Sequence, residues 1–188
     1  MRLIVISTYL LLSFAQFAFA EAIDYDIVTD RSDIGFTYQF GPDTIQGQFP
    51  DYSSVISIDF DKASNSQVEV TLNTQTTKAG FLFATQAVRS KKILHANKYP
   101  TIEFVSQSVK ADGAKAVIKG MVTVRGITKP LTLMAQLLRD PGTKASERDD
   151  LRIRITGDIN RHDFGASGYP SYVSDILAIT IDARIKSK

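Results

Sequence analysis

The sequence predicts an all-β fold of eight or nine antiparallel strands with one helix. Many segments of strand length carry apolar side chains at every second position, which is typical of an antiparallel sheet covered on one side. Residues 115–138 contain the clearest hairpin signal in the chain. Strands do not alternate with helices, so the parallel sheets of βαβ folds are not indicated. A sheet of so many antiparallel strands must remove its edges, and composition leaves a sandwich and a closed barrel both open.

The hairpin in residues 115–138 turns at Arg125-Gly126. A two-residue loop at this point pairs Val124 with Ile127 and Gly120 with Leu131. In this register nearly all apolar side chains of both strands share one face, and the other face suits contact with water. The turn and the apolar pattern therefore specify the same register.

Two irregularities are expected next to this hairpin. Pro130 has no N–H to donate, so it should mark an edge, a bulge or an open seam on the side away from its hairpin partner. The preceding strand would place Glu103 on the apolar face unless that strand gains one residue. We therefore predict a β-bulge between Val105 and Lys110.

The other strands are identified by the same two-residue period, and turn-forming residues separate them. They are predicted at residues 25–29, 32–40, 44–49, 54–60, 67–72 and 101–109, and from residues 151 and 175 onward. Residues 78–96 are rich in Ala, Gln, Leu and Lys and predict the one helix, which Tyr99-Pro100 ends. Residues 140–150 form a predicted polar loop, and residues 162–174 form a loop rich in glycine and aromatic residues.

Composition excludes several functional classes. The chain of 188 residues has a net charge of +2 with scattered Lys and Arg, which gives no indication of a nucleic-acid partner. It has no cysteine, which excludes disulfides, a thiolate nucleophile and a thiolate metal site. Its two histidines lack a carboxylate cluster at metal-binding spacing, so no metal site is predicted. The length fits one domain with a hydrophobic core.

The N-terminus predicts an exported protein. Arg2 precedes an almost continuous apolar run over residues 3–20, which ends in Ala18-Phe19-Ala20 before Glu21. This pattern is typical of a signal peptide over residues 1–20, cleaved to leave a domain of residues 21–188. The alternative is an uncleaved anchor, because the run is almost long enough to span a bilayer. The small residues favour cleavage, which would leave no stable membrane anchor and place the protein in a bacterial periplasm.

A catalytic centre is difficult to assemble from this sequence. His162 would form a hydrolase set with Asp163 and either Ser167 or Ser171. Adjacent residues of a strand point to opposite faces, so His162 and Asp163 are poorly placed to pair, and the chain has no Gly-x-Ser-x-Gly elbow. An enzyme acting through His162 or a tyrosine is kept as a minor alternative. We therefore predict no catalytic residues and no enzymatic activity.

Aromatic residues and glycines indicate a ligand site more strongly. Phe81 and Phe83 lie at the start of the predicted helix, where a lid on a barrel would lie. Gly47, Gly120 and Gly157 fall inside strand patterns, where they indicate either a bulge or bend or room for a ligand. On the second interpretation, a larger residue at Gly120 should impair ligand binding more than folding.

Several sequence blocks resemble the YceI family of lipid-binding, lipocalin-like proteins. They are Gly47-Gln48-Phe49 and residues 98–104, 120–133 and 159–165, together with Tyr25, Ser32 and Phe36. The resemblance implies an eight-stranded antiparallel β-barrel with one helix near its mouth. It also implies a bound isoprenoid quinone, polyprenyl phosphate or fatty-acid derivative along the barrel axis, export from the cytoplasm, and in one branch a homodimer. The family often has histidine at the positions of Arg31 and Gln39, so the ligand's head group stays open.

The function expected from the resemblance is that of a periplasmic carrier for a long apolar ligand. The alternative is a ligand-free, stress-related interaction module, which would have a filled interior. No cofactor is expected apart from a bound lipid. Arg161 is expected either to pair within its own loop or to contact the polar end of a ligand, and Arg89 is the predicted partner of an anionic or carbonyl head group. The candidate channel residues are Phe36, Tyr38, Phe40, Phe49, Phe104, Ile118, Val122, Leu133 and Ile155. The candidate lid and mouth residues are Phe81, Phe83, Arg89, Arg161, Phe164, Tyr169 and Tyr172.

Overall fold

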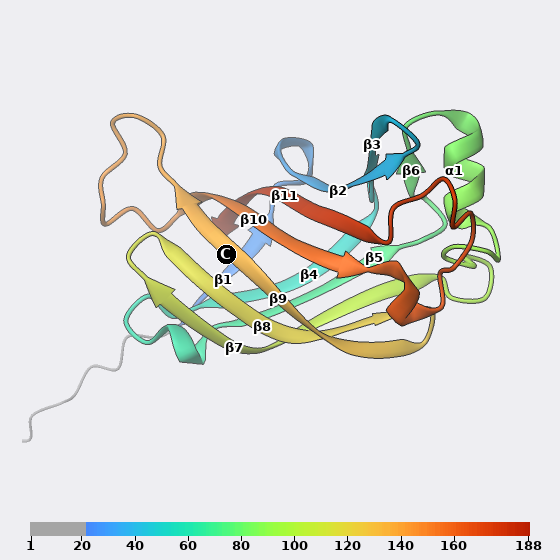
Figure 1. Cartoon of the computed structure of the whole chain (residues 1–188). Helices are drawn as coiled ribbons and strands as arrows, with labels where there is room; N and C mark the ends of the chain where they lie inside the picture. The colour runs from blue at the N-terminus through green and yellow to red at the C-terminus, as the bar shows by residue number, and fades with distance from the viewer. Residues whose placement is uncertain (1–21) are drawn as a thin grey trace, which may run out of the picture.

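A computed structural model describes residues 22–188, which form a closed antiparallel β-barrel (Figure 1). Eight strands close the ring, and β11 returns to pair with β1. In ring order they are β1 (Ile23–Ile27), β4 (Tyr52–Ile58), β5 (Gln67–Asn73), β7 (Thr101–Asp112), β8 (Lys115–Val124), β9 (Ile127–Leu138), β10 (Asp150–Asn160) and β11 (Ile176–Ser187). The predicted eight-stranded barrel is thereby confirmed. The predicted signal peptide lies outside the described residues.

Three further strands continue the sheet from β11: β2 (Asp33–Phe40), β3 (Asp43–Gln48) and β6 (Lys78–Ala79). The C-terminal part of β11 pairs with β1 through 185–187, while its residues 178–182 pair with β2. Because β10 follows the other side of β11 over almost its whole length, β1 and β2 share one side of it. The barrel wall therefore has different strands at its two ends. Short 3₁₀ turns lie at η1 (Thr29–Arg31), η2 (Ala63–Asn65) and η3 (Arg161–Phe164).

The β8–β9 hairpin has the predicted register, with Val124 opposite Ile127 and Gly120 opposite Leu131. Arg125 and Gly126 both have positive φ angles, 54° and 74°, as a two-residue hairpin loop of the favoured hand requires. The alternation of both strands places most of their apolar side chains inside the barrel, among them Ile118, Val122, Leu131 and Leu133.

The two predicted irregularities beside this hairpin are also confirmed. The register between β7 and β8 shifts between Ser106 and Ser108, within the predicted bulge interval. Strand β9 pairs with β10 only over 134–138, so an open seam runs along the outer side of Pro130.

The predicted helix over residues 78–96 is wrong in its limits. The helix α1 covers Leu82–Arg89 only. Lys78 and Ala79 instead form strand β6 against β3, because the edge of β3 offers unpaired backbone groups to an extended segment. Gly80, with a φ of 54°, turns the chain between β6 and α1, and Ser90 ends the helix by donating its N–H and hydroxyl to the Ala87 carbonyl.

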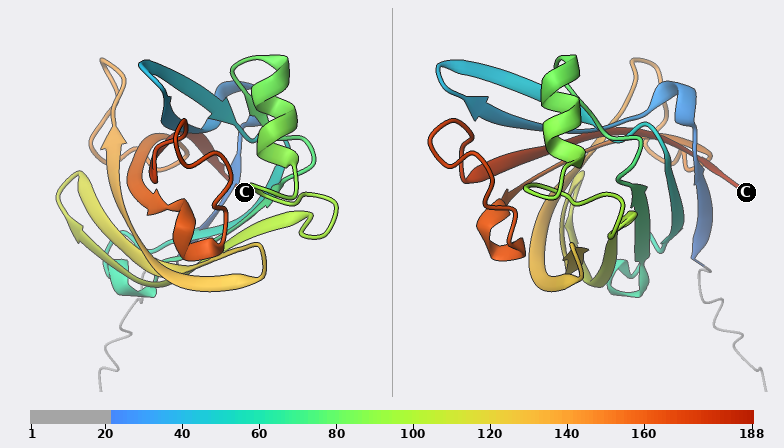
Figure 2. Two further views of the ribbon diagram at one scale, coloured as in Figure 1. Left: turned by 45° about the vertical axis from the view of Figure 1, so that its right-hand side comes forward. Right: turned by 90° about the vertical axis from the view of Figure 1, so that its right-hand side faces the viewer.

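Two apolar clusters divide the barrel interior. One cluster is solid and lies at the end opposite α1; it comprises Tyr25, Ile56, Leu151, Ala183 and Ile185. The larger cluster surrounds a cavity at the α1 end. Figure 1 shows the 139–149 loop at the first end and α1 with the 161–175 loop at the second, and Figure 2 views the second end from the front. No helix within residues 22–188 is both long enough and apolar enough to cross a membrane.

Candidate ligand-binding cavity

The barrel contains a cavity of about 730 Å³ at its α1 end. Its wall follows from strand geometry, since successive side chains of a strand point to opposite faces and every second residue faces inward. On β7 the inward residues are Ile102 and Phe104, and on β8 they include Ile118 and Val122. The volume lies within the range of about 300–1,000 Å³ typical of small-molecule sites.

The structure brings together almost all the residues predicted for a ligand site. The following predicted residues line the cavity: Phe36, Tyr38, Phe40, Phe49, Phe81, Phe83, Phe104, Ile118, Val122, Leu133, Ile155, Arg161, Phe164, Tyr169 and Tyr172. They come from seven different elements, from the positions just after β3 and just before α1, and from the loop 165–175, so the fold is needed to join them. Their contact with a ligand stays a prediction.

Arg89 is the exception. It is not among the residues that line the cavity, and its Nε–H donates to the carbonyl oxygen of Thr77 at 2.7 Å. Thr77 is fully buried, so Arg89 provides the hydrogen-bond donor for a carbonyl group that has no access to water. The prediction that Arg89 meets a ligand's head group therefore does not agree with its position.

Several wall residues on β5 and β11 were not predicted from the sequence. They are Val68, Val70, Leu72, Leu177, Ile179 and Ile181. Their two-residue period marked an inward face on each strand, which was the available signal. The same period describes a solid core, so only the closed barrel shows that these side chains face a cavity.

Aromatic residues form the mouth of the cavity. Phe81, Phe83 and Tyr172 line it and are also exposed to solvent, so the cavity reaches the surface beside α1. The ring of Phe40 stacks on that of Tyr172 with centroids 6.0 Å apart, and meets Phe81 edge-on at 6.5 Å. These contacts join the β2–β3 hairpin, α1 and the 161–175 loop around one opening.

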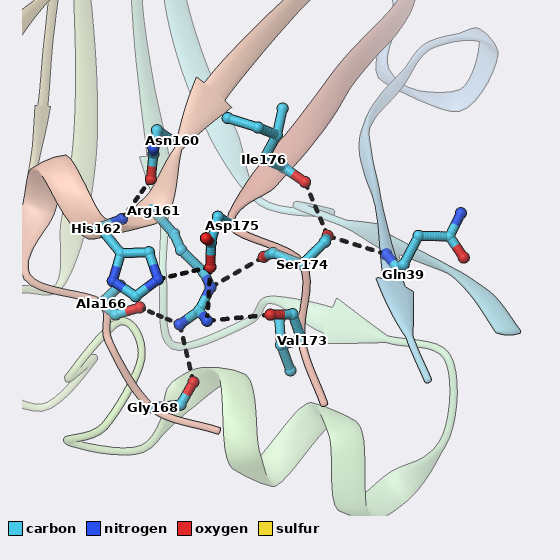
Figure 3. A network of polar contacts seen from close by, with 10 residues as sticks. All are labelled: Gln39, Asn160, Arg161, His162, Ala166, Gly168, Val173, Ser174, Asp175 and Ile176. Carbon is cyan, nitrogen blue, oxygen red and sulfur yellow. Dashed lines mark hydrogen bonds and ion pairs between the residues drawn. The ribbon is translucent and has the colours of Figure 1, made fainter. Parts of the chain in front are cut away.

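Arg161 organises the loop that carries Tyr169 and Tyr172 (Figure 3). The side chain is 5% exposed, and all five of its N–H groups have protein acceptors. Nε donates to the Ser174 carbonyl at 2.9 Å, and the terminal nitrogens donate to the carbonyls of Ala166, Gly168 and Val173 and to Asp175 Oδ1. This arrangement favours the structural role of Arg161 over contact with a ligand's polar end.

The cavity wall holds no other charged residue than Arg161 among the residues described. The polar side chains on it include Tyr38, and burial raises the pKa of this phenol above its ordinary value of 10.0. An anionic group placed in the interior would find no free cation to offset its loss of hydration, which is costly. The site is therefore suited to an uncharged, apolar ligand segment.

Candidate catalytic residues do not converge. His162 Nε2 lies 2.7 Å from Asp175 Oδ1, and not beside Asp163. Within residues 22–188, neither Ser167 nor Ser171 hydrogen bonds to His162, and no group of three His, Asp or Glu residues is arranged to hold a metal ion.

Comparisons with known proteins agree with this geometry. The model of the YceI-like domain matches residues 25–185. "Protein YceI" of Shigella flexneri is 34% identical over 134 residues, which cover 68% of this chain and 70% of the relative. The crystal structure of BcnA from Burkholderia cenocepacia superposes with a TM-score of 0.76 at 20% identity, over 85% of this chain and 99% of that one. A polyisoprenoid binding domain from Saccharophagus degradans, implicated in plant cell wall breakdown, gives a TM-score of 0.61 at 10% identity, over 88% and 99% of the two chains. These two structures share the barrel fold.

Proposed function

The chain belongs to the YceI family, and from this premise we propose that it is a periplasmic carrier that holds the apolar chain of an isoprenoid quinone, a polyprenyl phosphate or a fatty-acid derivative. The observation that carries the proposal is the cavity of about 730 Å³ with an almost entirely apolar wall. The relative described as a polyisoprenoid binding domain supports the same ligand class.

Apolar burial supplies enough free energy for useful affinity. Burial contributes about 25 cal/mol per Å², so a chain that buries on the order of 400 Å² gains about 10 kcal/mol. Ordering the flexible chain removes part of this gain. Micromolar affinity needs about 8 kcal/mol, so few polar contacts are required.

The charge distribution sets the orientation of the ligand. Among the described residues, the wall has no free cation, since the five N–H groups of Arg161 are all engaged by the protein. A phosphate or carboxylate therefore stays at the mouth beside α1, where water reaches it, while the hydrocarbon chain extends toward the solid cluster around Tyr25. A ligand-free interaction module would have a filled interior, and the cavity argues against that alternative.

Native mass spectrometry of the protein purified from its host tests the proposal. We expect an adduct whose mass matches an isoprenoid or acyl lipid, and rebinding of isoprenoid quinones or polyprenyl phosphates after extraction. Val70→Phe should reduce the bound fraction, because Val70 lines the cavity. Val55→Phe is the matched control, because Val55 lies on the neighbouring strand and is 59% exposed. A spectrum without adduct, together with no rebinding of either lipid class, would reject the carrier role.

N-terminal sequencing of the same preparation tests export. A chain that begins near Glu21 agrees with a cleaved signal peptide, and a chain that retains Met1 contradicts it.

A further inference from the structure

The mouth of the cavity carries an unusual exposed apolar surface, which we call the mouth rim. It consists of Phe40, Phe81, Leu82, Phe83 and Tyr172. Leu82 and Phe83 are 67% and 74% exposed, although both are large apolar side chains. Phe81 occupies the position before the first helical residue and provides no side-chain cap, where Ser, Thr, Asp or Asn is usual. Three consecutive apolar residues therefore begin the helix, although a polar capping residue would make the helix more stable.

The mouth rim is continuous with the interior of the barrel. Phe81 and Phe83 belong to the cavity wall and to the outer surface at once. The ring contacts of Phe40 with Phe81 and Tyr172 join the three sides of the opening. An apolar path therefore leads from the cavity to the outside without a polar barrier between them.

The segment that carries α1 is strongly basic, in contrast to the balanced charge of the whole chain. Residues 70–102 contain five Lys or Arg residues and no Asp or Glu. They are Lys78, Arg89, Lys91, Lys92 and Lys98. None of the five forms an ion pair with another described residue. Lys92 Nζ lies 5.2 Å from the centre of the Tyr169 ring, which places one of these charges directly beside the mouth.

Acidic residues lie at this end of the barrel as well, but outside the segment that carries α1. They are Asp43, Asp51, Glu103, Asp163 and Asp175, of which Asp51 accepts a hydrogen bond from Asn73 and Asp175 is engaged by Arg161 and His162. At the opposite end of the barrel, the loop over residues 139–149 carries three basic and three acidic residues. The excess of positive charge is therefore local to the segment that also carries Phe81, Leu82 and Phe83.

We propose that the mouth rim docks on a bilayer surface that contains anionic lipid, with Leu82 and Phe83 among the acyl chains and Lys91 and Lys92 beside the head groups. An exposed apolar surface flanked by basic residues binds such an interface through burial and electrostatic attraction together. Each Lys or Arg held near an anionic surface strengthens binding by about fivefold. This inference rests on the proposed carrier function, since docking lets an apolar chain pass between bilayer and cavity without crossing water.

Co-sedimentation with vesicles tests the docking surface on the protein as it is exported and purified. One set of vesicles contains phosphatidylethanolamine and phosphatidylglycerol, the other phosphatidylcholine alone, and neither contains an isoprenoid lipid. We expect binding to the anionic vesicles, weaker binding to the neutral ones, and weakening by added salt. Lys91→Glu should reduce the partition coefficient by about fivefold or more. Leu82→Ser should also reduce it, and Leu82 is suited to this test because it does not line the cavity.

Two matched controls separate the mouth rim from general effects of charge and hydrophobicity. Lys144→Glu makes the same charge change in the loop at the opposite end. Val55→Ser removes an exposed apolar side chain from the outer wall of β4. Both should bind anionic vesicles as the unmodified protein does.

Three results would overturn the inference. The first is equal partition to both kinds of vesicle, or to neither. The second is a loss caused by Lys144→Glu that equals the loss caused by Lys91→Glu. The third is a dimer in solution that Leu82→Ser dissociates, because a second copy of the chain would then cover the mouth rim. Native mass spectrometry distinguishes this failure from failure of the carrier function: bound lipid without vesicle binding rejects docking alone, and vesicle binding without bound lipid rejects the carrier alone.

Discussion

The ring of Phe36 lies over the backbone of Gly47, its cross-strand partner, so closely that a Cβ on Gly47 would stand 2.2 Å from Phe36 Cζ. A similar relationship holds at Gly120, where a Cβ would stand 2.7 Å from Phe104 Cζ. The interpretation that these two glycines leave room for a ligand is therefore wrong. They leave room for aromatic rings, and those rings form the cavity wall.

Gly47→Ala should lower ligand affinity with little effect on stability. The added methyl group meets the tip of the Phe36 ring, which can shift toward the empty cavity and reduce its volume. We expect about a tenfold loss of affinity for an isoprenoid quinone, and a loss of less than about 1.5 kcal/mol in the free energy of unfolding. Titration by native mass spectrometry and urea unfolding measure the two effects. Phe36→Leu in the same chain should restore binding, and failure of this rescue would contradict the explanation.

Gly120→Ala should lower stability as well as affinity, contrary to the expectation from sequence that ligand binding suffers more than folding. Its Cβ would stand 2.3 Å from the carbonyl oxygen of Val105, which belongs to the β7–β8 ladder and has little freedom to move. We expect a loss of about 2–3 kcal/mol in the free energy of unfolding. The folded fraction should also lose affinity for the quinone by about tenfold, because the added Cβ would stand 2.7 Å from Phe104 Cζ and displace that ring into the cavity. If the variant kept its normal stability but lost ligand binding, Gly120 would instead be a ligand contact.

Arg161→Gln should destabilise the 161–175 loop and thereby the mouth. The change removes donors from four carbonyl groups that have this guanidinium as their partner (Figure 3). Hydrogen bonds to charged groups contribute about 1.5–3 kcal/mol, so we expect a loss of that order in the free energy of unfolding. Hydrogen exchange should accelerate across the loop. Arg154→Gln is the matched control, because its exposed pair with Asp182 is worth at most about 1 kcal/mol. Equal losses in the two variants would refute the role given to Arg161.

Acid should weaken the end of the barrel opposite the mouth. Arg184 donates Nη1 to Asp140 Oδ2 at 2.6 Å and Nε to Asp150 Oδ1, and these hydrogen bonds hold the pKa of both carboxyl groups below the usual 3.8. Because the folded-state pKa values are depressed, the contribution of these groups is complete above pH 3.8 and is lost as the pH falls toward the folded-state values. Arg184→Gln should lower Tm at neutral pH, and the difference from the unmodified protein should narrow below about pH 4. A difference that is constant with pH, measured by circular dichroism, would exclude this linkage.

The sequence specifies the strands and their register more completely than the chemistry of the site. The β8–β9 register was predictable because Arg125-Gly126 and the apolar alternation independently select the same pairing. The limits of the helix were not, because the pairing of Lys78 and Ala79 depends on the edge of β3, which is remote in the sequence. Helix propensity contains no information about such a partner.

Arg89 and Arg161 show the same limit. The role of Arg89 depends on a buried carbonyl at Thr77, and the role of Arg161 on four carbonyls that only the folded loop brings together. Strands that face a cavity and strands that face a solid core both carry apolar residues at every second position. The channel was therefore expected from the family resemblance and not from this alternation alone.

Along one side, β11 pairs with β1 near its C-terminal end and with β2 further back. This division affects how the fold can diversify. The pairs that close the ring involve 185–187, whereas β2, β3, β6 and α1, which form one side of the mouth, attach through 178–182. Substitutions on that side of the opening are therefore remote from the pairs that close the ring. A lineage built on this plan can change the shape and charge of the opening at one end of the barrel, while the other end keeps the solid cluster around Tyr25.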